Sequence, residues 1–212
     1  MKKKKKRLLP FLIFALIIAV VTAVCFKLFV PDTKRVEKAQ SLVLPDFVKQ
    51  DFIHKHTTAR TGIVLEDIKN IVIHYVGNPN TNAQNNRDYF DNPKTGVSSH
   101  FVVGLEGEVI QCLPLFERSA ASNNRNKDTI SIETCHPDES GKFSEDTYNS
   151  LVKLTAFLCS ELDLSENDVI RHYDITGKIC PKYYVENEDE WETFKKDVGK
   201  AIDDYGKAKE NN

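Results

Sequence analysis

Residues 68–75 read IKNIVIHY, a β-branched and apolar stretch that predicts a strand buried inside a folded domain. Four later stretches of similar character predict further strands: 99–103 (SHFVV), 108–113 (EVIQCL), 129–135 (TISIETC) and 169–171 (VIR). A GLEG sequence between the first two of these four predicts a hairpin turn. In the 129–135 stretch side chains alternate between the two faces of the strand, so Ile130 and Ile132 lie opposite Glu133.

Helical signals alternate with these strands. A short helix is expected around 83–90, and a longer one begins after Ser144, which can cap a helix N-terminus. The longer helix carries leucines at helical spacing: Leu151, Leu154, Leu158 and Leu162. A last helix with one apolar stripe is predicted over 189–205. Strands and helices together in one domain of this size indicate a mixed α/β layer fold.

The charge of the chain is unevenly divided. Its 212 residues include 29 Lys+Arg and 31 Asp+Glu, and the formal net charge of −2 excludes a generally basic nucleic-acid-binding protein. Residues 1–30 hold seven of the cations and no acid, so the remainder carries a net charge of −9. The two parts are therefore expected to face different surroundings.

Residues 8–30 are almost continuously apolar (LLPFLIFALIIAVVTAVCFKLFV) and directly follow a basic tail over 1–7. An apolar run of about 20 residues matches the hydrocarbon core of a membrane, and the positive-inside rule keeps the basic tail cytoplasmic. We therefore expect a single-pass signal anchor, with the following domain outside the cytoplasm. One alternative is a signal peptide cleaved near Ala23, which would release the domain. A second alternative, lipidation of Cys25, is disfavoured because the preceding Val24 is bulky where a small residue is expected.

The other domain boundaries follow from composition. Residues 31–50 are mixed and charged, which predicts a juxtamembrane stalk or short helix with little core of its own. The globular pattern runs over 51–206, and residues 207–212 form a polar tail.

Three residues are candidate ligands for a d¹⁰ metal ion. His74 lies at the end of the first strand, His172 follows the strand at 169–171, and Cys180 comes eight residues later in GKICP. Three protein ligands with a fourth open position describe a catalytic zinc site. The alternative is structural, with hydrogen-bonded core histidines and a small buried thiol. Spacing alone leaves both interpretations open.

Four motifs in this chain resemble the zinc-dependent N-acetylmuramoyl-L-alanine amidases, a family that includes endolysins, autolysins and the peptidoglycan-recognition proteins. They occur in the family order: 71–81 (IVIHYVGNPNT), 98–114 (SSHFVVGLEGEVIQCLP), 124–137 (NRNKDTISIETCHP) and 171–181 (RHYDITGKICP). The resemblance extends over 51–206 and implies a central mixed β-sheet flanked by helices, with zinc at the floor of an open groove. It implies that the zinc ligands are His74, His172 and Cys180.

The resemblance also suggests roles for three further side chains. Glu133 matches the general base of the endolysin-like branch, and Lys178 matches a lysine that helps to stabilise the oxyanion. His100 is expected to contact substrate in the groove. Some relatives have a catalytic tyrosine at the position of Ser99, so the serine here places that variant mechanism in doubt. The structural alternatives are an exposed strand carboxylate, a solvated loop lysine and a structural histidine.

The function implied by the resemblance is that of a membrane-anchored zinc amidase. It would hydrolyse the amide bond between N-acetylmuramic acid and the L-alanine of the peptidoglycan stem peptide. One alternative is a sensor that holds a muropeptide without cleaving it. Another is a thiol hydrolase in which Cys180 is the nucleophile and His172 the base. The presence of Cys180 and Glu133 favours the zinc enzyme.

Three further cysteines and His136 lie outside this set of candidate site residues. A disulfide between Cys112 and Cys135 is conceivable if their strands are neighbours, but the sequence does not establish it. Cys159 is expected to be buried in the long helix. His136 is interpreted as a loop residue with no metal role.

Overall fold

The computed structural model describes residues 12–18, 33–55 and 59–210 of the chain, which divides into two units, 1–32 and 33–212. In the first unit, residues 12–18 are helical and their apolar side chains are exposed. Most of the predicted anchor at 8–30, with Ala23 and Cys25, lies outside the described residues. Within the described parts of the chain, no helix is both long enough and apolar enough for a membrane span.

The second unit is built on a six-stranded mixed sheet in the order β1-β4-β3-β5-β2-β6. Its strands are β1 (Val48–Gln50), β2 (Asn70–Ile73), β3 (Phe101–Val103), β4 (Val109–Gln111), β5 (Thr129–Thr134) and β6 (Val169–Arg171). Only the β3–β4 hairpin is antiparallel among these strands, and β2 runs parallel to both of its neighbours, β5 and β6. The predicted α/β class with a central mixed sheet is confirmed.

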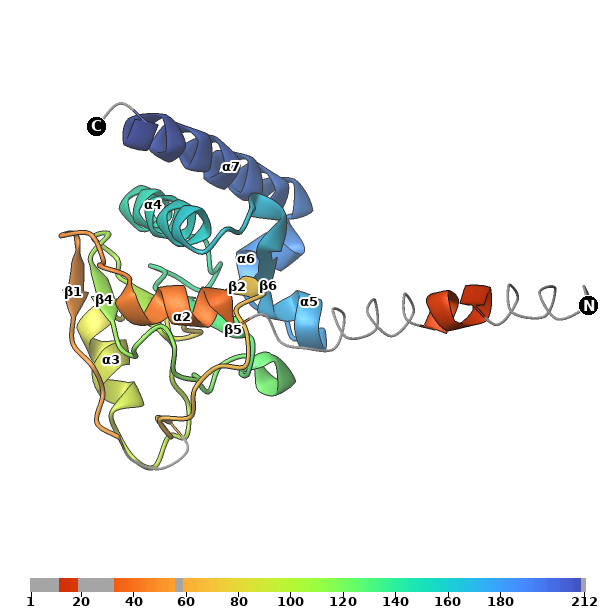
Figure 1. Ribbon diagram of the computed structural model, residues 1–212. Coiled ribbons are helices and arrows are strands. Elements are labelled where there is room, and N and C mark those ends of the chain that lie inside the picture. Colours follow the sequence, from red (N-terminus) through yellow and green to blue (C-terminus); the bar gives the residue numbers. More distant parts are fainter. Residues whose placement is uncertain (1–11, 19–32, 56–58, 211–212) are drawn as a thin grey trace, which may run out of the picture. The chain divides into compact units, whose positions relative to one another are not determined.

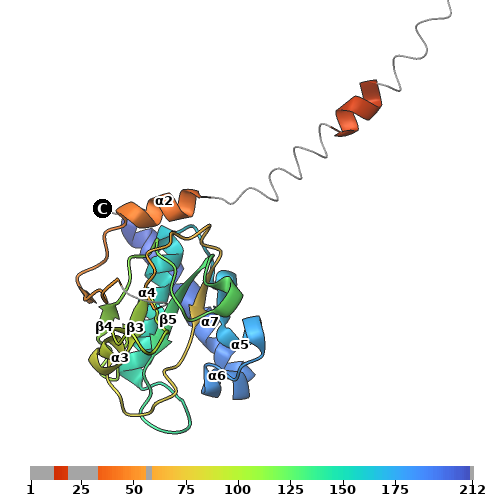
Figure 2. The same cartoon turned by 90° about the horizontal axis from the view of Figure 1, so that it is seen from below.

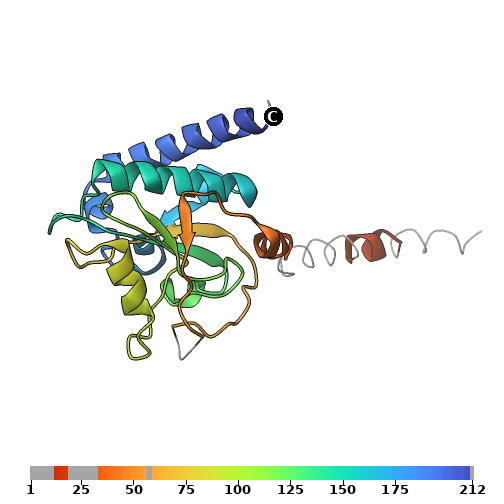
Figure 3. The ribbon, with the colours of Figure 1, turned by 90° about the vertical axis from the view of Figure 1, so that its left-hand side faces the viewer.

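Helices cover both faces of the sheet. Helix α4 (Glu145–Glu161) packs on one face, and α7 (Glu188–Glu210) runs alongside α4 (Figures 1 and 3). Helix α3 (Ala83–Phe90) packs on the opposite face, where its Phe90 joins Val102 and Ile110 in a second, smaller core. The side chain of Ser144 accepts a hydrogen bond from the backbone of Thr147, as expected for the N-cap of α4.

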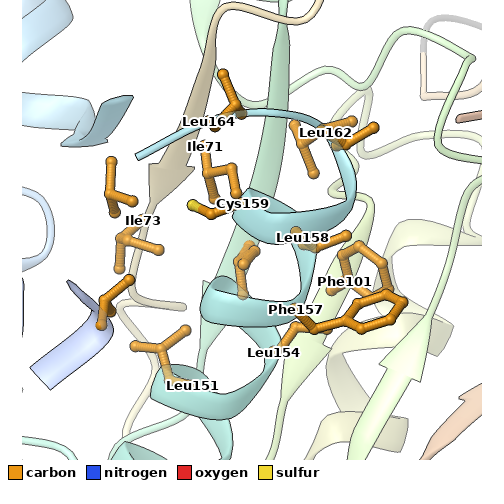
Figure 4. Packing of buried hydrophobic residues seen from close by; sticks show 14 of the residues in the cluster. Ile71, Ile73, Phe101, Leu151, Leu154, Phe157, Leu158, Cys159, Leu162 and Leu164 are labelled. Carbon is orange, nitrogen blue, oxygen red and sulfur yellow. The ribbon is translucent and has the colours of Figure 1, made fainter. Parts of the chain in front are cut away.

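The larger core lies between the sheet and α4. Leucines of α4 and the turn after it pack against Ile71, Ile73 and Phe101, and all of these side chains are buried (Figure 4). The leucines are those predicted from helical spacing: Leu151, Leu154, Leu158 and Leu162. Because close-packed interiors deform little, a sheet that is buried on both faces holds the side chains at the ends of its strands in fixed positions.

The segment expected to be a stalk belongs to the folded unit instead. Helix α2 (Lys34–Ser41) buries Val36 and Ala39 in the larger core, and β1 adds a strand to the sheet beside β4. The unit therefore begins at Thr33 rather than at residue 51. The charged composition of 31–50 obscured this, because only two residues of α2 are buried and β1 is an edge strand.

Short elements complete the unit: η2 (Asn123–Arg125), η3 (Glu166–Asp168), α5 (His172–Thr176) and α6 (Lys182–Glu186). Figure 2 shows α5 and α6 near one edge of the sheet. Helix α3 lies toward the opposite edge, where β3 and β4 are. The carboxyl ends of β2, β5 and β6 lie side by side, because the three strands are parallel and adjacent.

Candidate metal centre

Strand register brings three of the candidate site residues level with one another. Ile73 in β2 pairs with Ile132 in β5 and with Arg171 in β6. One residue further along each strand are His74, Glu133 and His172. Three side chains that are far apart in the sequence therefore lie together at the carboxyl ends of three adjacent strands.

The ligand atoms of His74, His172 and Cys180 all lie within 4.8 Å of one another. The imidazole rings of the two histidines are 4.8 Å apart at their centroids, and Cys180 Sγ lies 3.8 Å from His74 Nδ1. All three residues are buried. The structure thus brings together the three ligands predicted from the sequence.

The Nε2 atoms of the two histidines contact one loop. His172 Nε2 donates to Asn123 Oδ1 at 2.9 Å, and His74 Nε2 lies 3.3 Å from Ser122 Oγ. The other nitrogen of His172, Nδ1, is buried and has no hydrogen-bond partner. A buried nitrogen without a partner costs free energy unless something coordinates it, so this atom fits a metal-ligand role.

Burial sets the protonation of the three candidate ligands. It holds the pKa of His74 well below its usual range, with His172 and Lys178 adding to the effect. Burial also lowers the pKa of His172, with a further contribution from Lys178. It raises the pKa of Cys180 to about 12, helped by the carboxylate of Glu133. Neutral imidazoles suit a metal ion, and a bound cation would replace the thiol proton.

Glu133 lies beside the cluster. Its Oε1 is 4.0 Å from His74 Nδ1, and its Oε2 is buried without a hydrogen-bond partner. Burial raises the pKa of Glu133 to about 8, although the charge of Lys178 acts in the opposite direction. The unpartnered oxygen of this carboxyl group can form a hydrogen bond with a water molecule or a substrate group.

Lys178 reaches the same site from a turn. Helix α5 ends at Thr176 and is followed by its C-cap residue Gly177, whose φ of 76° is left-handed and suits glycine best. The chain then returns through Lys178 to Cys180, where the carbonyl of Cys180 accepts from the amide of Tyr173 at 3.0 Å. Lys178 is exposed at its own position and lines the cavity described below.

The side chains of the candidate site line a cavity of about 550 Å³. His74, Glu133, His172 and Cys180 line it together with Lys178. Its other lining residues come from α3 and the loops around it: Tyr75, Val76, Asn78, Thr81, Asn85, Asn86, Tyr89, Phe90, Val97, Ser98, Ala120 and Ala121. From the sequence, this part of the chain was expected only to hold a short helix around 83–90, with no role in the site. Ser122 and Asn123 were missed as well, because no sequence signal was available for them.

His100 does not lie in the cavity, and its expected contact with substrate is wrong. The residue is fully buried. Its Nδ1 accepts from the amide of Ser131 at 3.0 Å, and its Nε2 donates to the carbonyl oxygen of Glu117 at 2.8 Å. The sequence indicated that His100 lies beside a strand, but only the packing of the folded unit shows that its ring points into the protein interior. Neighbouring Ser99 is also fully buried and donates to the carbonyl oxygen of Ser131.

The conceivable disulfide is not formed. Cys112 and Cys135 lie in the same small core, but both are free thiols, as are Cys159 and Cys180. Cys159 is buried in α4 as expected. His136 lies in the loop after β5, and its Nδ1 contacts the carbonyl oxygen of Asp138 at 2.7 Å.

The fold and this cluster define an α/β domain with a candidate metal centre at the ends of three parallel strands. Residues 65–183 match a family model described as N-acetylmuramoyl-L-alanine amidase. Because the match covers more than half of the chain, the protein belongs to this family, and the resemblance of the four sequence motifs is confirmed.

Individual relatives agree with this assignment. The amidase CwlL of Bacillus licheniformis is 30% identical over 172 residues, which are 73% of this chain and 47% of CwlL. The amidase BlyA of Bacillus subtilis (strain 168) is 33% identical over 167 residues, 69% of this chain and 44% of BlyA. The chain therefore spans about half the length of these curated relatives.

Solved structures show the same fold. The catalytic domain of XlyA superimposes with a TM-score of 0.62 at 27% identity, covering 72% of this chain and 99% of that domain. A mutant endolysin from Bacillus subtilis gives a TM-score of 0.63 at 28% identity, covering 72% of this chain and 98% of that chain.

Proposed function

We propose that this protein is a zinc-dependent peptidoglycan amidase that hydrolyses the bond between N-acetylmuramic acid and the L-alanine of the stem peptide. The observation that carries the proposal is the convergence of His74, His172 and Cys180 beside Glu133 in one cavity. The family of the chain supplies the substrate class.

The donor set suits zinc. Two neutral imidazole nitrogens and one thiolate sulfur are common zinc ligands, and three protein ligands leave a coordination position open for chemistry. His74, His172 and Cys180 would hold the ion. When bound, zinc supplies Lewis-acid chemistry, which lowers the pKa of water toward neutrality and polarises a carbonyl group.

Two side chains of the chain would move or stabilise charge. Glu133 would accept the proton of the attacking water through its unpartnered carboxylate oxygen, and would later pass that proton to the leaving amine of L-alanine. Lys178 would place its ammonium group near the negative charge that develops on the carbonyl oxygen. The amide-rich wall formed by Asn78, Asn85 and Asn86 would offer hydrogen bonds to the muropeptide.

The structure weighs against the thiol hydrolase. A nucleophilic cysteine needs a lowered pKa, whereas burial raises the pKa of Cys180 to about 12. In addition, His172 Nε2 is engaged by Asn123, and the imidazole atom that contacts the sulfur, at 3.8 Å, is Nδ1 of His74. A protonated, enclosed thiol is better suited to exchanging its proton for a metal ion.

The test combines metal analysis with product detection. The full chain, purified without chelator, is expected to contain about one zinc ion and to release L-alanine amino termini from purified peptidoglycan. EDTA should abolish the release and added zinc should restore it, while Cys180→Ser should lower both zinc content and release. Zinc without release, but with muropeptide binding, would instead identify a sensor. Release that survives zinc removal would overturn the zinc mechanism.

We further propose, from the sequence, that residues 8–30 anchor the protein in the membrane with the catalytic unit outside the cytoplasm. Confinement by an anchor would keep turnover within the wall layer next to the membrane. In cells, the full chain should sediment with membranes and resist extraction with alkaline carbonate. A mature protein that starts near residue 24 and is recovered in the medium would contradict the anchor.

A further inference from the structure

The loop between β4 and β5 touches both histidines of the candidate metal centre from outside. Asn123 Oδ1 lies 2.9 Å from His172 Nε2, and Ser122 Oγ lies 3.3 Å from His74 Nε2. Neither Ser122 nor Asn123 belongs to the four sequence motifs or lines the cavity. Their side chains therefore contact the candidate ligands and not the space that a substrate would occupy.

The Asn123 contact determines which nitrogen of His172 carries a proton. A side-chain amide oxygen can only accept a hydrogen bond, so His172 Nε2 must donate. A neutral imidazole has one N–H group, so Nδ1 is left with an available lone pair. This Nδ1 is the buried atom without a partner.

The loop is built to hold Asn123 in place. Asn123 has a φ of 54°, in the left-handed region that asparagine and glycine tolerate best. The side-chain oxygen of Asn126 accepts from the amides of Ala121 and Ser122 at 3.1 and 2.6 Å. Arg125 then ties the loop to the sheet, donating to Asn70 Oδ1 and Asp128 Oδ1, both at 2.6 Å.

We infer that Asn123 is a positioning residue for the metal centre, which fixes the tautomer and the ring orientation of His172 so that Nδ1 faces the ion. The inference rests on the proposed zinc site. Asn126 and Arg125 support this role by holding the loop, and Ser122 makes the corresponding contact with His74. Partners of this kind around ligating histidines commonly contribute about 10–100-fold to metal affinity.

Two substitutions separate the side chain from the backbone. Asn123→Gly keeps a left-handed backbone accessible but removes the acceptor, whereas Asn123→Asp keeps an acceptor oxygen in the same place. Asn80→Gly is the matched control, because Asn80 also has a positive φ, of 60°, and does not line the cavity. Asn123 and Asn80 are both exposed, so all three variants are expected to fold.

Zinc affinity is the first readout, measured on the full chain by competition with a chromophoric chelator. Asn123→Gly is expected to bind zinc about 10–100-fold more weakly than the parent, with Asn123→Asp and Asn80→Gly within about threefold of it. Parent-like affinity in Asn123→Gly would overturn the inference while leaving the zinc site intact. Equal losses in Asn123→Gly and Asn123→Asp would also overturn it. A parent protein that binds no zinc would overturn the proposed function and the inference with it.

A second readout needs no metal. Nitrogen-15 NMR of the imidazole groups in the metal-free protein distinguishes a protonated ring nitrogen from a bare one. The parent should show His172 with its proton on Nε2, and Asn123→Gly should show a mixture of tautomers. A single Nε2-protonated form in both proteins would overturn the role of Asn123 whatever the zinc measurements show.

Discussion

His74 Nδ1 lies 4.0 Å from Glu133 Oε1 across two adjacent parallel strands, β2 and β5. The two residues are 59 positions apart in the chain, and they face each other because Ile73 pairs with Ile132 one step earlier. Strand register therefore decides that a candidate base stands next to a candidate metal ligand. A shift of one residue in this register would turn Glu133 to the other face of the sheet.

Replacing Glu133 with glutamine should remove turnover while leaving the proposed zinc site intact. The amide has nearly the same shape but cannot accept a proton, so we expect a loss of roughly 10²–10⁴-fold in kcat. Release of L-alanine amino termini measures turnover, and metal analysis measures bound zinc. Glu106→Gln, at an exposed turn position, serves as the control and should match the parent. Parent-like activity in Glu133→Gln would exclude the role as base.

Replacing Lys178 with methionine should lower kcat by roughly 100-fold, because a cation near the developing oxyanion is lost. KM should change little, since the interaction belongs mainly to the transition state. Steady-state kinetics on a soluble muropeptide separate the two constants. Lys127→Met is the matched control, because Lys127 is an exposed lysine paired with Glu66. Equal kinetics in the two variants would remove Lys178 from the mechanism.

Stability should fall in mild acid because of His100. Burial lowers the pKa of His100 to about 4, from a usual value of about 6.5, so between these values the unfolded chain binds the proton more readily. Stability is therefore lost as pH falls from about 6.5 toward 4, by about 2 kcal/mol between pH 7 and pH 5 for this one group. Protonation would also break the hydrogen bond from the amide of Ser131 to Nδ1.

The variant His100→Gln isolates that effect, because glutamine does not titrate. Urea unfolding at pH 7 and pH 5 gives the free energy of unfolding of both proteins. The parent should lose about 2 kcal/mol more than the variant over this range, whatever their stabilities at pH 7. Equal losses would show that His100 titrates normally and is not enclosed as described.

Arg35 should stabilise the folded unit that begins at Thr33, although it lies in the segment whose composition suggested a stalk. Its guanidinium donates to the carbonyl oxygens of Leu162 and Asp163, at 2.8 and 2.9 Å, just after α4 ends. Arg35→Ala should lower the free energy of unfolding by about 1–2 kcal/mol, since it removes hydrogen bonds from a charged donor. Lys38→Ala is the control, because its ion pair with Asp163 is exposed and should contribute less than about 1 kcal/mol. Equal effects would argue against the docking of α2.

Much of the fold was predictable because its signals are local. The apolar run ending at His74 and the leucine spacing from Leu151 identify a buried strand and a long helix without any knowledge of the partner elements. The packing of helix α2 into the core was not predicted because only Val36 and Ala39 are buried, too few for a periodic pattern to stand out. Asn123 was missed for another reason. Its role depends on contact with His172, 49 residues away, and no local pattern records that contact.

By itself, the sequence determined which residues carry chemistry and which stretches form strands and helices, because residue type and hydrophobic period act over a few neighbouring positions. Tertiary structure alone decided what those residues face. It enclosed His100 between Ser131 and Glu117, and it placed Asn123 against His172. The physical reason is that the environment of a side chain is set by the register and packing of distant segments, which local patterns do not encode.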